Sequence, residues 1–593
     1  YIAHVLGGIK YAIGKGEKPD YSKAKAQYRP DQSRFHKQII KEGLDEPIAL
    51  AISKGGKVFY CERKGKIFCF NSKKGGVKQV ANLLVDDFAG NGIMGMTLDP
   101  DFDYNHYMYV FYIDTFQLYK LSRFNFINDQ LDLNSEKLVF SYKLDKEPGA
   151  HNGGTILFDK EGNILISTGD NTPPWQANGY PPYDQRVGRE MYDAQRTAAN
   201  SNDFRGKILR IKPNSNGLGY TIPEGNLFGE NTPNCRPEIY VMGCRNPWKM
   251  SYDKKTNYLY WGEVGPDAAN DSTVGTKGYD EINQARKAGF FGWPYLIANN
   301  KTYAMVDLVN ERPGAMSDPN AIVNLSKNNT GIQKIPFQPH KALIYYPYSQ
   351  SFEFPEVGSG GRTACAGPVY YQADAKNSDV KFPAYYNGKL FIYEWMRDWI
   401  KAVTLDAEGN YVTMEPVMEN VQFAHPSHIL FASDGSLYVL EYGYIWYSQS
   451  GNARLSRVTF HQGNRPAEAK ITALTDTIGV EPFIIKLSAT KSFDPDGDSL
   501  TFEWSDGNYQ ESKGKIATFQ YDKPGVYWAK LLAKDKNGTA SMAFQKVIVG
   551  NTFPKVKLIT SSGNSSFYWE NSALKYLSLI HISEPTRLRR ISY

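Results

Sequence analysis

A histidine and a carboxylate stand at the two ends of a short segment, His151 to Asp170, that has the pattern of a β-hairpin. Residues 155–158 and 164–167 are apolar and are separated by turn residues 159–163. Two strands joined by a glycine-containing turn bring both ends of the segment to the same edge. We therefore expect His151 to lie beside Asp170, and a carboxylate beside an imidazole fixes its tautomer and prepares it as a general base. Polar hairpin ends without a catalytic role are the simpler alternative.

The chain around this segment has the composition of a β-rich protein with more than one domain. It contains 593 residues, including 52 Gly, 41 Tyr and 31 Phe, which is too long for one core and rich in turn and strand formers. The formal net charge of +6 is too small to indicate nucleic acid binding. No apolar run is long enough to cross a membrane. The cysteines lack zinc-site spacing; Cys61 and Cys69 could pair across a hairpin, but two free thiols are the favoured interpretation.

Short strands between turn clusters extend over residues 34–462, and segments such as DKEGNILIS and ASDGSLYVL repeat one turn-and-strand pattern. Repeated β units without helices between them predict a six-bladed β-propeller with long loops. Residues 464–550 contain about seven short strands, which predicts an immunoglobulin-like sandwich. Its motifs SFDPDGD, EWSDG and YDKPGVY resemble the PKD domain. There, Asp494, Asp496 and Asp498 form either a calcium site or an Asp-rich turn.

The two ends of the chain differ from these domains. Residues 1–16 have the spacing of an amphipathic helix, and HVLGGIKYAIGKG resembles the end of a ThuA-like (trehalose-utilisation) domain. Residues 17–33 are predicted to be a polar linker. Residues 551–576 are expected to begin a further β domain, which is then cut short. Residues 577–593 resemble translated sequencing-adapter DNA rather than a folded segment.

Four segments of the predicted propeller carry a specific resemblance: AGNGIMGMTLDPDFDYNHYMYVFY, HNGGTILFDKEGNILISTGD, GCRNPWKMSYD and EVGPDAANDSTVGTKGYDEINQARKAGFFGWP. In this order and spacing they resemble the glucose/sorbosone dehydrogenase family, the soluble quinoprotein sugar dehydrogenases. The resemblance implies a six-bladed propeller with pyrroloquinoline quinone (PQQ) and calcium in the mouth of its channel. The implied activity is PQQ-dependent oxidation of the anomeric hydroxyl of an aldose.

The resemblance also implies catalytic roles for three residues. His151 matches the general base that removes the proton of the anomeric hydroxyl. Asp170 matches the acid that orients this histidine. Arg245 matches an arginine at the reacting quinone oxygen, where a cation suits the negative charge that develops.

Further residues match positions that hold the cofactor and the metal. Asn246 shares the cofactor motif with the preceding arginine, and Asp280 matches an acidic residue near the cofactor. Gly265 and Pro266 match residues whose backbone carbonyls bind calcium, a hard cation that prefers oxygen ligands. Arg397 takes the place of a lysine that faces the cofactor.

The sequence departs from the family pattern on the opposite wall of the pocket. Gly90 stands where an acidic or amide residue is expected, and residues 425–428, His-Pro-Ser-His, replace a pair of arginines. PQQ carries three carboxylates, so the loss of two arginines removes charge-assisted binding. Either the cofactor binds differently here, or the propeller has kept its shape without the redox role.

We expect a small sugar substrate and an electron acceptor, for example a cytochrome c domain, in a bacterial protein of the periplasm or the extracellular space. Neither nucleic acid nor a membrane span is expected. Two other classes of function stay open. One is a non-catalytic propeller that binds carbohydrate or protein, and the other is a hydrolase or lyase that uses the His–Asp pair with calcium; fold alone does not choose between them.

Overall fold

The structure, a computed structural model, consists almost entirely of β-strands. It describes residues 9, 28–71, 75–145, 151–174, 181–310, 312–375, 378–506 and 509–550, with the backbone of two further strands, Lys555–Thr560 and Tyr576–His581. Its α-helix in the described residues, α2, is the short segment Phe102–Asn105. The all-β prediction is confirmed. The search of the described residues for a long apolar helix that could span a membrane found none.

Six sheets of the described residues, each built on four antiparallel strands, account for the segment between residues 35 and 460. Their strands are β2 Pro47–Ile52, β3 Lys57–Glu62, β4 Lys66–Asn71 and β5 Val77–Asn82; β6 Ile93–Leu98, β7 Tyr107–Ile113, β8 Leu118–Ile127 and β9 Gln130–Lys143; β10 Gly153–Phe158, β11 Ile164–Thr168, β12 Lys207–Pro213 and β14 Ile239–Met242; β15 Pro247–Asp253, β16 Tyr258–Glu263, β17 Asp280–Ala285 and β23 Ile344–Tyr346; β24 Ala364–Val369, β25 Leu390–Glu394, β26 Trp399–Leu405 and β27 Tyr411–Pro416; and β28 Pro426–Phe431, β29 Leu437–Glu441, β30 Arg454–Phe460 and β1 Phe35–Glu42. We number these sheets 1 to 6 in this order.

The first strand of each sheet lies on the inside of the molecule. Contacts join β2 to β6, β6 to β10, β10 to β15, β15 to β24, β24 to β28 and β28 back to β2, so these inner strands form a closed ring. Every inner strand contains a bulge or irregularity in its pairing with the next strand, which increases local twist. Separate apolar clusters fill the space between each pair of neighbouring sheets. This is the arrangement of a propeller.

The ring is closed by strands from opposite ends of the segment. β1 pairs antiparallel with β30, from Phe35 opposite Phe460 to Glu42 opposite Arg454. The N-terminal strand therefore completes sheet 6, so opening the ring requires breaking a full strand ladder.

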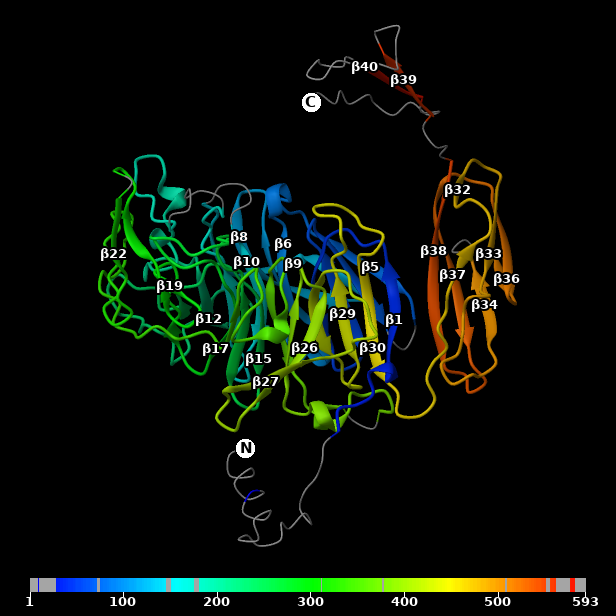
Figure 1. Cartoon of the computed structure of the whole chain (residues 1–593), viewed down its shortest axis with the longest axis horizontal. Coiled ribbons are helices and arrows are strands. Elements are labelled where there is room, and N and C mark those ends of the chain that lie inside the picture. The colour runs from blue at the N-terminus through cyan, green and yellow to red at the C-terminus, as the bar shows by residue number, and fades with distance from the viewer. Residues whose placement is uncertain are drawn as a thin grey trace.

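A second domain follows and packs beside the first. Its two sheets contain β31 Thr472–Ala473, β33 Phe483–Ser488 and β36 Ile516–Tyr521, and β32 Ile478–Gly479, β34 Thr501–Ser505, β35 Glu511–Lys513, β37 Gly525–Lys534 and β38 Ala540–Val549. They enclose one apolar core, which confirms the predicted β-sandwich. Strand β38 contacts β1 of the propeller, and Figure 1 shows the sandwich next to β1.

Smaller elements occupy the loops and the C-terminal end. They are the strands β13 Tyr220–Thr221, β18 Gly289–Phe290, β19 Leu296–Ile297, β20 Lys301–Thr302, β21 Ala304–Asp307 and β22 Arg312–Met316, and the 3₁₀ turns η1 Gln32–Arg34, η2 Phe88–Gly90, η3 Glu190–Tyr192, η4 Ala194–Arg196, η5 Pro355–Val357, η6 Gln372–Asp374 and η7 Ala384–Tyr386. β39 Lys555–Thr560 pairs with β40 Tyr576–His581, so this hairpin extends past the expected boundary at residue 576. The predicted helix 1–16 and most of the predicted linker lie outside the described residues.

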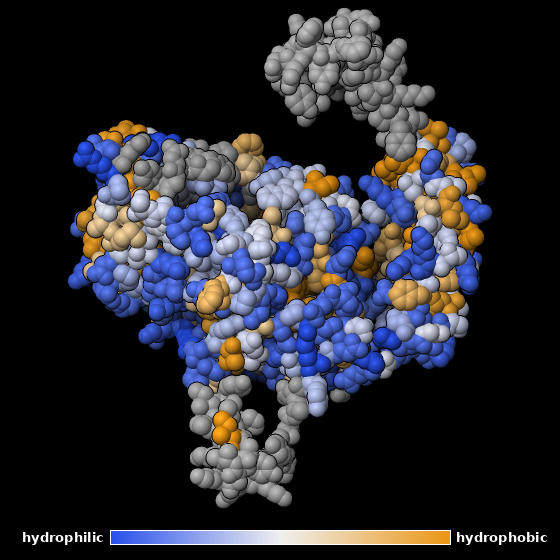
Figure 2. Space-filling model, viewed as in Figure 1, coloured by the Kyte–Doolittle hydropathy of each residue, from blue (hydrophilic) through white to orange (hydrophobic). Residues whose placement is uncertain are grey.

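The cysteines and the visible surface agree with the composition. All five cysteines are free and buried, which confirms the preference for thiols at Cys61 and Cys69. The face seen in Figure 2 is mostly hydrophilic, with apolar side chains in small separate groups.

Candidate functional site

The hairpin at residues 153–168 brings His151 and Asp170 together, as its pattern predicts. Nδ1 of His151 lies 2.7 Å from Oδ1 of Asp170, and the pair joins the start of β10 to the end of β11. Trp293 Nε1 donates to Oδ2 of Asp170 at 2.8 Å, and the backbone N–H of Thr172 donates to Oδ1 at 2.8 Å. A carboxylate only accepts, so Nδ1 of His151 must carry the proton in this pair and Nε2 has a free lone pair.

Burial keeps His151 neutral. The side chain is 9% exposed, and burial, followed by the nearby charge of Arg245, lowers its pKa below the ordinary value of 6.5, although Asp170 opposes this change. A neutral imidazole with a fixed tautomer can accept a proton at neutral pH.

Polar residues directly before the six inner strands surround the same mouth of the channel. They are Glu46, Asn91, His151, Arg245, Arg362 and His425, and all are buried. Hydrogen bonds between residues next to members of this group link neighbouring inner strands: Asn152 donates to Gly90 O at 3.0 Å and Gly153 N donates to Asn246 Oδ1 at 3.0 Å. The sequence scatters these residues over four hundred positions, and only closure of the ring brings them together. We call this group the mouth ring.

Arg245 is held beside the histidine by the end of strand β16. Its Nη1 donates to Val264 O at 2.7 Å, and its guanidinium lies over the ring of Trp293. The backbone N–H groups of Arg245 and Asn246 both donate to Oε1 of Glu263. Burial, reinforced by Glu281, raises the pKa of Glu263 to about 8. Glu263 was not among the predicted site residues; its position as the last residue of a second strand is the signal that could have identified it.

Asp280 joins the loop of Gly265 and Pro266 to sheet 5. Its carboxylate accepts from Gly265 N at 3.1 Å and from Ala364 N at 3.0 Å. Arg362 lies 3.5 Å from the same carboxylate and donates through Nη2 to Pro266 O at 2.7 Å. The predicted residues Gly265, Pro266 and Asp280 are therefore adjacent, and an unpredicted arginine lies among them. Arg362 precedes its inner strand by two positions, as does Arg245.

Arg397 lies in a different setting. Its guanidinium donates to the backbone carbonyls of Pro347, Val357, Gly358, Gly360 and Gly361 at 2.7 to 3.2 Å. These contacts hold the loop between β23 and β24, and they leave the arginine few donors for a cofactor.

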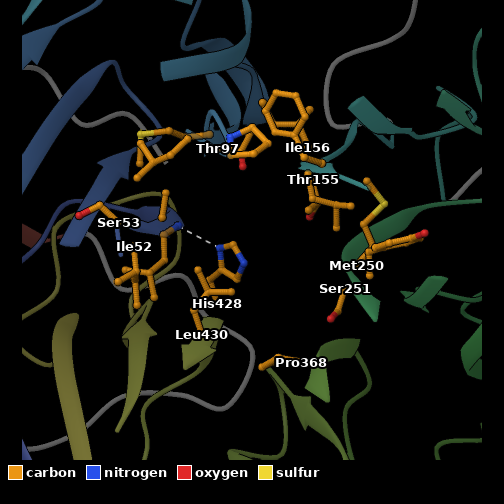
Figure 3. A pocket seen from close by; sticks show the side chains of 18 of the residues that line it. Ile52, Ser53, Thr97, Thr155, Ile156, Met250, Ser251, Pro368, His428 and Leu430 are labelled. Atoms are coloured by element: carbon orange, nitrogen blue, oxygen red, sulfur yellow. Dashed lines mark hydrogen bonds between the residues drawn. The ribbon is translucent and has the colours of Figure 1, made fainter. Parts of the chain in front are cut away.

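Residues 425–428, which replace the expected arginine pair, face different ends of the channel. His425 Nδ1 lies 2.9 Å from Asp398 Oδ1 at the mouth. Ser427 donates to Pro47 O and Leu440 O inside the wall. His428 accepts from Leu50 N at 2.9 Å and faces a cavity of about 380 Å³ at the far end of the channel, as Figure 3 shows.

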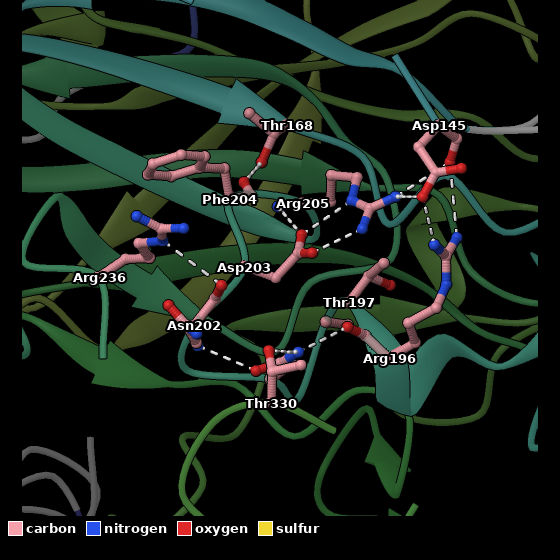
Figure 4. Close-up of polar contacts among 12 residues, drawn as sticks. Asp145, Thr168, Arg196, Thr197, Asn202, Asp203, Phe204, Arg205, Arg236 and Thr330 are labelled. Carbon is pink, nitrogen blue, oxygen red and sulfur yellow. Dashed lines mark hydrogen bonds and ion pairs between the residues drawn. The ribbon is translucent and has the colours of Figure 1, made fainter. Parts of the chain in front are cut away.

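A network of charged residues, partly buried, lies beside the strand that precedes Asp170. Arg205 makes a two-bond pair with Asp203 at 2.6 and 2.8 Å, and Asp145 accepts from both Arg205 and Arg196. Thr168 Oγ1 donates to the carbonyl of the neighbouring Phe204 at 2.6 Å. Figure 4 shows this network beside the end of β11. The network holds the loop around Phe204 next to the end of β11. We therefore assign it a structural role and no part in the reaction.

The mouth ring has the donors that a carboxylate-bearing cofactor requires. Arg362 is buried, and its Nη1 already lies 3.5 Å from the Asp280 carboxylate, whereas its Nε makes no hydrogen bond in the part of the chain that the structure describes. A buried donor is costly to leave unpaired, and a carboxylate would satisfy Nε. Calcium fits less well, because the carbonyl of Pro266 already accepts from a guanidinium. The search of the described residues for metal-binding groups of three or more His, Cys, Asp or Glu found none.

The same finding bears on the sandwich. Asp496 pairs with Arg465 at 2.7 Å, and Asp494 Oδ1 accepts from the backbone N–H groups of Asp496 and Asp498. These contacts favour an Asp-rich turn over a calcium site.

Residues 44–336 match the family described as Glucose / Sorbosone dehydrogenase, and residues 467–549 match the PKD domain. Curated relatives include quinoprotein glucose dehydrogenase B of Acinetobacter calcoaceticus, 26% identical over 46% of this chain and 54% of the relative. Aldose sugar dehydrogenase YliI of Escherichia coli K12 is 25% identical over 43% of this chain and 61% of the relative. The chain thus spans little more than half the length of these relatives.

Solved structures resemble a larger share of the chain. The PQQ-bound aldose sugar dehydrogenase of Streptomyces coelicolor is 16% identical, with a TM-score of 0.46, over 72% of this chain and 98% of that protein. The apo-form of the soluble aldose sugar dehydrogenase of Escherichia coli is 20% identical, with a TM-score of 0.47, over 72% of this chain and 99% of that protein.

Proposed function

We propose that this chain, in which a glucose/sorbosone dehydrogenase domain precedes a PKD domain, is a PQQ-dependent oxidoreductase that oxidises the anomeric hydroxyl of an aldose. The observation that carries the proposal is the buried His151–Asp170 pair at the mouth ring, with Arg245 beside it.

The chemistry divides between the cofactor and the chain. Bound PQQ would supply the acceptor for the hydride that leaves the anomeric carbon, so the sugar becomes a lactone. His151 Nε2 takes the proton of the anomeric hydroxyl, and Asp170 stabilises the imidazolium that forms. Arg245 places positive charge where negative charge develops. The Nε of Arg362 is the unpaired donor that would hold a carboxylate of the cofactor.

The other residues predicted to bind the cofactor or calcium fit these roles less well. Asn246 and Asp280 organise the backbone around the arginines rather than presenting free groups. The Pro266 carbonyl would bind calcium only after Arg362 moved away, so we assign no step to calcium. An electron acceptor such as a cytochrome c domain, and a periplasmic or extracellular location, stay predictions.

Reconstitution tests the proposal. Purified chain is mixed with PQQ, with and without Ca²⁺, and dye reduction is followed with a panel of aldoses. We expect reduction with at least one aldose and a shift in the absorbance of added PQQ. Absence of both would exclude the quinoprotein function.

A second candidate is a carbohydrate-binding propeller without redox activity. The wall around His425 favours it, because this wall contains aromatic rings and the Asp398 carboxylate where the family has arginines. Sugar binding measured by calorimetry on the same protein, without dye reduction, would support this candidate.

A further inference from the structure

Aromatic side chains gather at one side of the mouth, on the loop that follows β29. Tyr444, Trp446 and Tyr447 are 52%, 52% and 59% exposed. Behind them, the ring of Trp395 is buried and lies 4.9 Å from that of Trp446. With His425, these residues form what we call the aromatic rim. Large aromatic rings grouped in solvent are unusual unless they bind something.

The aromatic rim is fixed by contacts rather than being a loose loop. The ring of His425 lies 4.7 Å from Trp395 and 4.8 Å from Tyr444. Both oxygens of Asp398 are used: Oδ1 faces His425 Nδ1 at 2.9 Å, and Oδ2 accepts from Tyr444 OH at 3.1 Å. Trp395 Nε1 is buried and makes no hydrogen bond within the described part of the chain. The rim therefore combines exposed ring faces with an unpaired donor and a carboxylate.

The aromatic rim lies on the opposite side of the mouth from the catalytic pair. Sheet 6 carries most of the rim and sheet 3 carries His151, so the two are three places apart in the ring of six inner strands. The rim still adjoins the site through Tyr447, which lies beside Gly90, whose carbonyl accepts from Asn152. One sugar ring reacting at His151 cannot also stack on the far side of the mouth.

We propose that the aromatic rim is a subsite for a second or later unit of a sugar chain, so the preferred substrate is an oligosaccharide oxidised at its reducing end. This inference rests on the proposed function for its reacting end. A pyranose presents a face of C–H groups and an edge of hydroxyls. Exposed tryptophan and tyrosine rings suit the face, while the Asp398 carboxylate, whose side chain is 30% exposed, suits the hydroxyls. The negative charge of Asp398 would repel the carboxylates of a cofactor, so the rim is poorly suited to bind them.

The test compares one sugar with chains of it. Glucose, maltopentaose, cellopentaose and laminaripentaose are offered to the full chain, reconstituted with PQQ, and kcat/KM is measured for each. Binding to the chain without PQQ is measured in parallel by calorimetry. We expect at least one pentasaccharide to exceed glucose about tenfold in kcat/KM, which is the size of effect that one good pocket contact supplies.

Single substitutions test whether the preference for a pentasaccharide arises at the aromatic rim. Trp446→Ala should lower the ratio of pentasaccharide to glucose kcat/KM about tenfold, and Trp446→Phe should recover part of it because a ring is kept. Tyr104→Ala removes another aromatic ring, which is 90% exposed and follows Asp103, a residue that lines the cavity at the far end of the channel; it should leave the ratio unchanged.

The outcomes separate the two proposals. Glucose oxidation with no preference for any pentasaccharide, or a ratio that Trp446→Ala does not change, overturns the subsite and leaves the enzyme intact. Pentasaccharide binding that Trp446→Ala weakens, without dye reduction by any sugar, supports the subsite and overturns the dehydrogenase.

Discussion

At the scale of single residues, the proposed chemistry depends on one histidine and one carboxylate. Asp170 is fully buried and accepts from Trp293 and Thr172 in addition to facing His151. These contacts fix the carboxylate, so it holds the imidazole with the proton on Nδ1 and leaves Nε2 as the acceptor.

Asp170→Asn tests this positioning role. An amide can present its N–H group to Nδ1 and stabilise the wrong tautomer, so we expect kcat/KM to fall by about 10²-fold or more. Steady-state dye reduction gives the rate, and PQQ absorbance gives cofactor binding, which should be kept. A fall of less than about threefold would contradict the role.

The pH dependence follows from the lowered pKa of His151. The reaction needs the neutral base, so kcat/KM should rise with pH through the histidine pKa, with the midpoint of the rise below the ordinary value of 6.5. Arg245 contributes to the lowering after burial, so Arg245→Leu should move this limb to higher pH. Profiles of kcat/KM between pH 4 and 8 check both statements. A limb above pH 7 in the unsubstituted protein would show that another group controls the rate.

The sequence alone allowed the two hairpin residues of the site to be predicted, but not the residues on the opposite wall of the mouth. His151 and Asp170 are predictable because hairpin ends always meet. Arg362 was missed because its place beside Pro266 depends on the closure of six sheets, which no local pattern reveals. Arg397 was assigned by correspondence with a family position, and its contacts with five backbone carbonyls could not be read from the residues around it.

At the scale of elements, a glutamate at the end of the second strand ties each of four sheets to the mouth. Glu62 accepts from Asp45 N, Glu263 from Arg245 N, Glu394 from Thr363 N and Glu441 from Ala424 N. In each case the donor lies just before the inner strand of the same sheet. The repeated ending of FYCE, YWGE, FIYE and YVLE is therefore the sequence signal of the mouth ring.

Glu394→Ala tests this connection. It leaves the N–H groups of Thr363 and Arg397 without their acceptor, and we expect a loss of about 2–4 kcal/mol in the free energy of unfolding. Urea denaturation measures it. Glu408→Ala, in an exposed turn of the same sheet, should change the free energy by less than about 0.5 kcal/mol. Equal effects of the two substitutions would contradict the connection.

At the scale of the whole molecule, the sandwich packs on the strand that closes the ring. Gly43 follows β1 with a φ of +72°, and a Cβ there would lie 2.8 Å from Trp528 of the sandwich. Arg34 adds hydrogen bonds to the carbonyls of His461, Gln462 and Gly463 at the junction. The domain order was predictable from motifs, but this contact was not, because it joins residues from two separate folding units.

Gly43→Ala should disturb the junction. A left-handed conformation costs a residue with a Cβ about 1–2 kcal/mol, and the clash with Trp528 adds to this cost. Gly388→Ala is the matched control, because Gly388 has a φ of +78° and an added Cβ would meet no atom within 4 Å. We expect both to lower the melting temperature, but only Gly43→Ala to increase trypsin cleavage between the domains. Equal cleavage would show that the contact does not hold the domains together.

The central claim is that His151 removes the proton in a reaction that reduces bound PQQ. The direct measurement is a single turnover: PQQ-loaded protein is mixed with an excess of the best aldose without any dye, and cofactor absorbance is followed. The account predicts rapid reduction with the unsubstituted protein, and PQQ binding without reduction with His151→Ala. Reduction at the same rate in both proteins would contradict it.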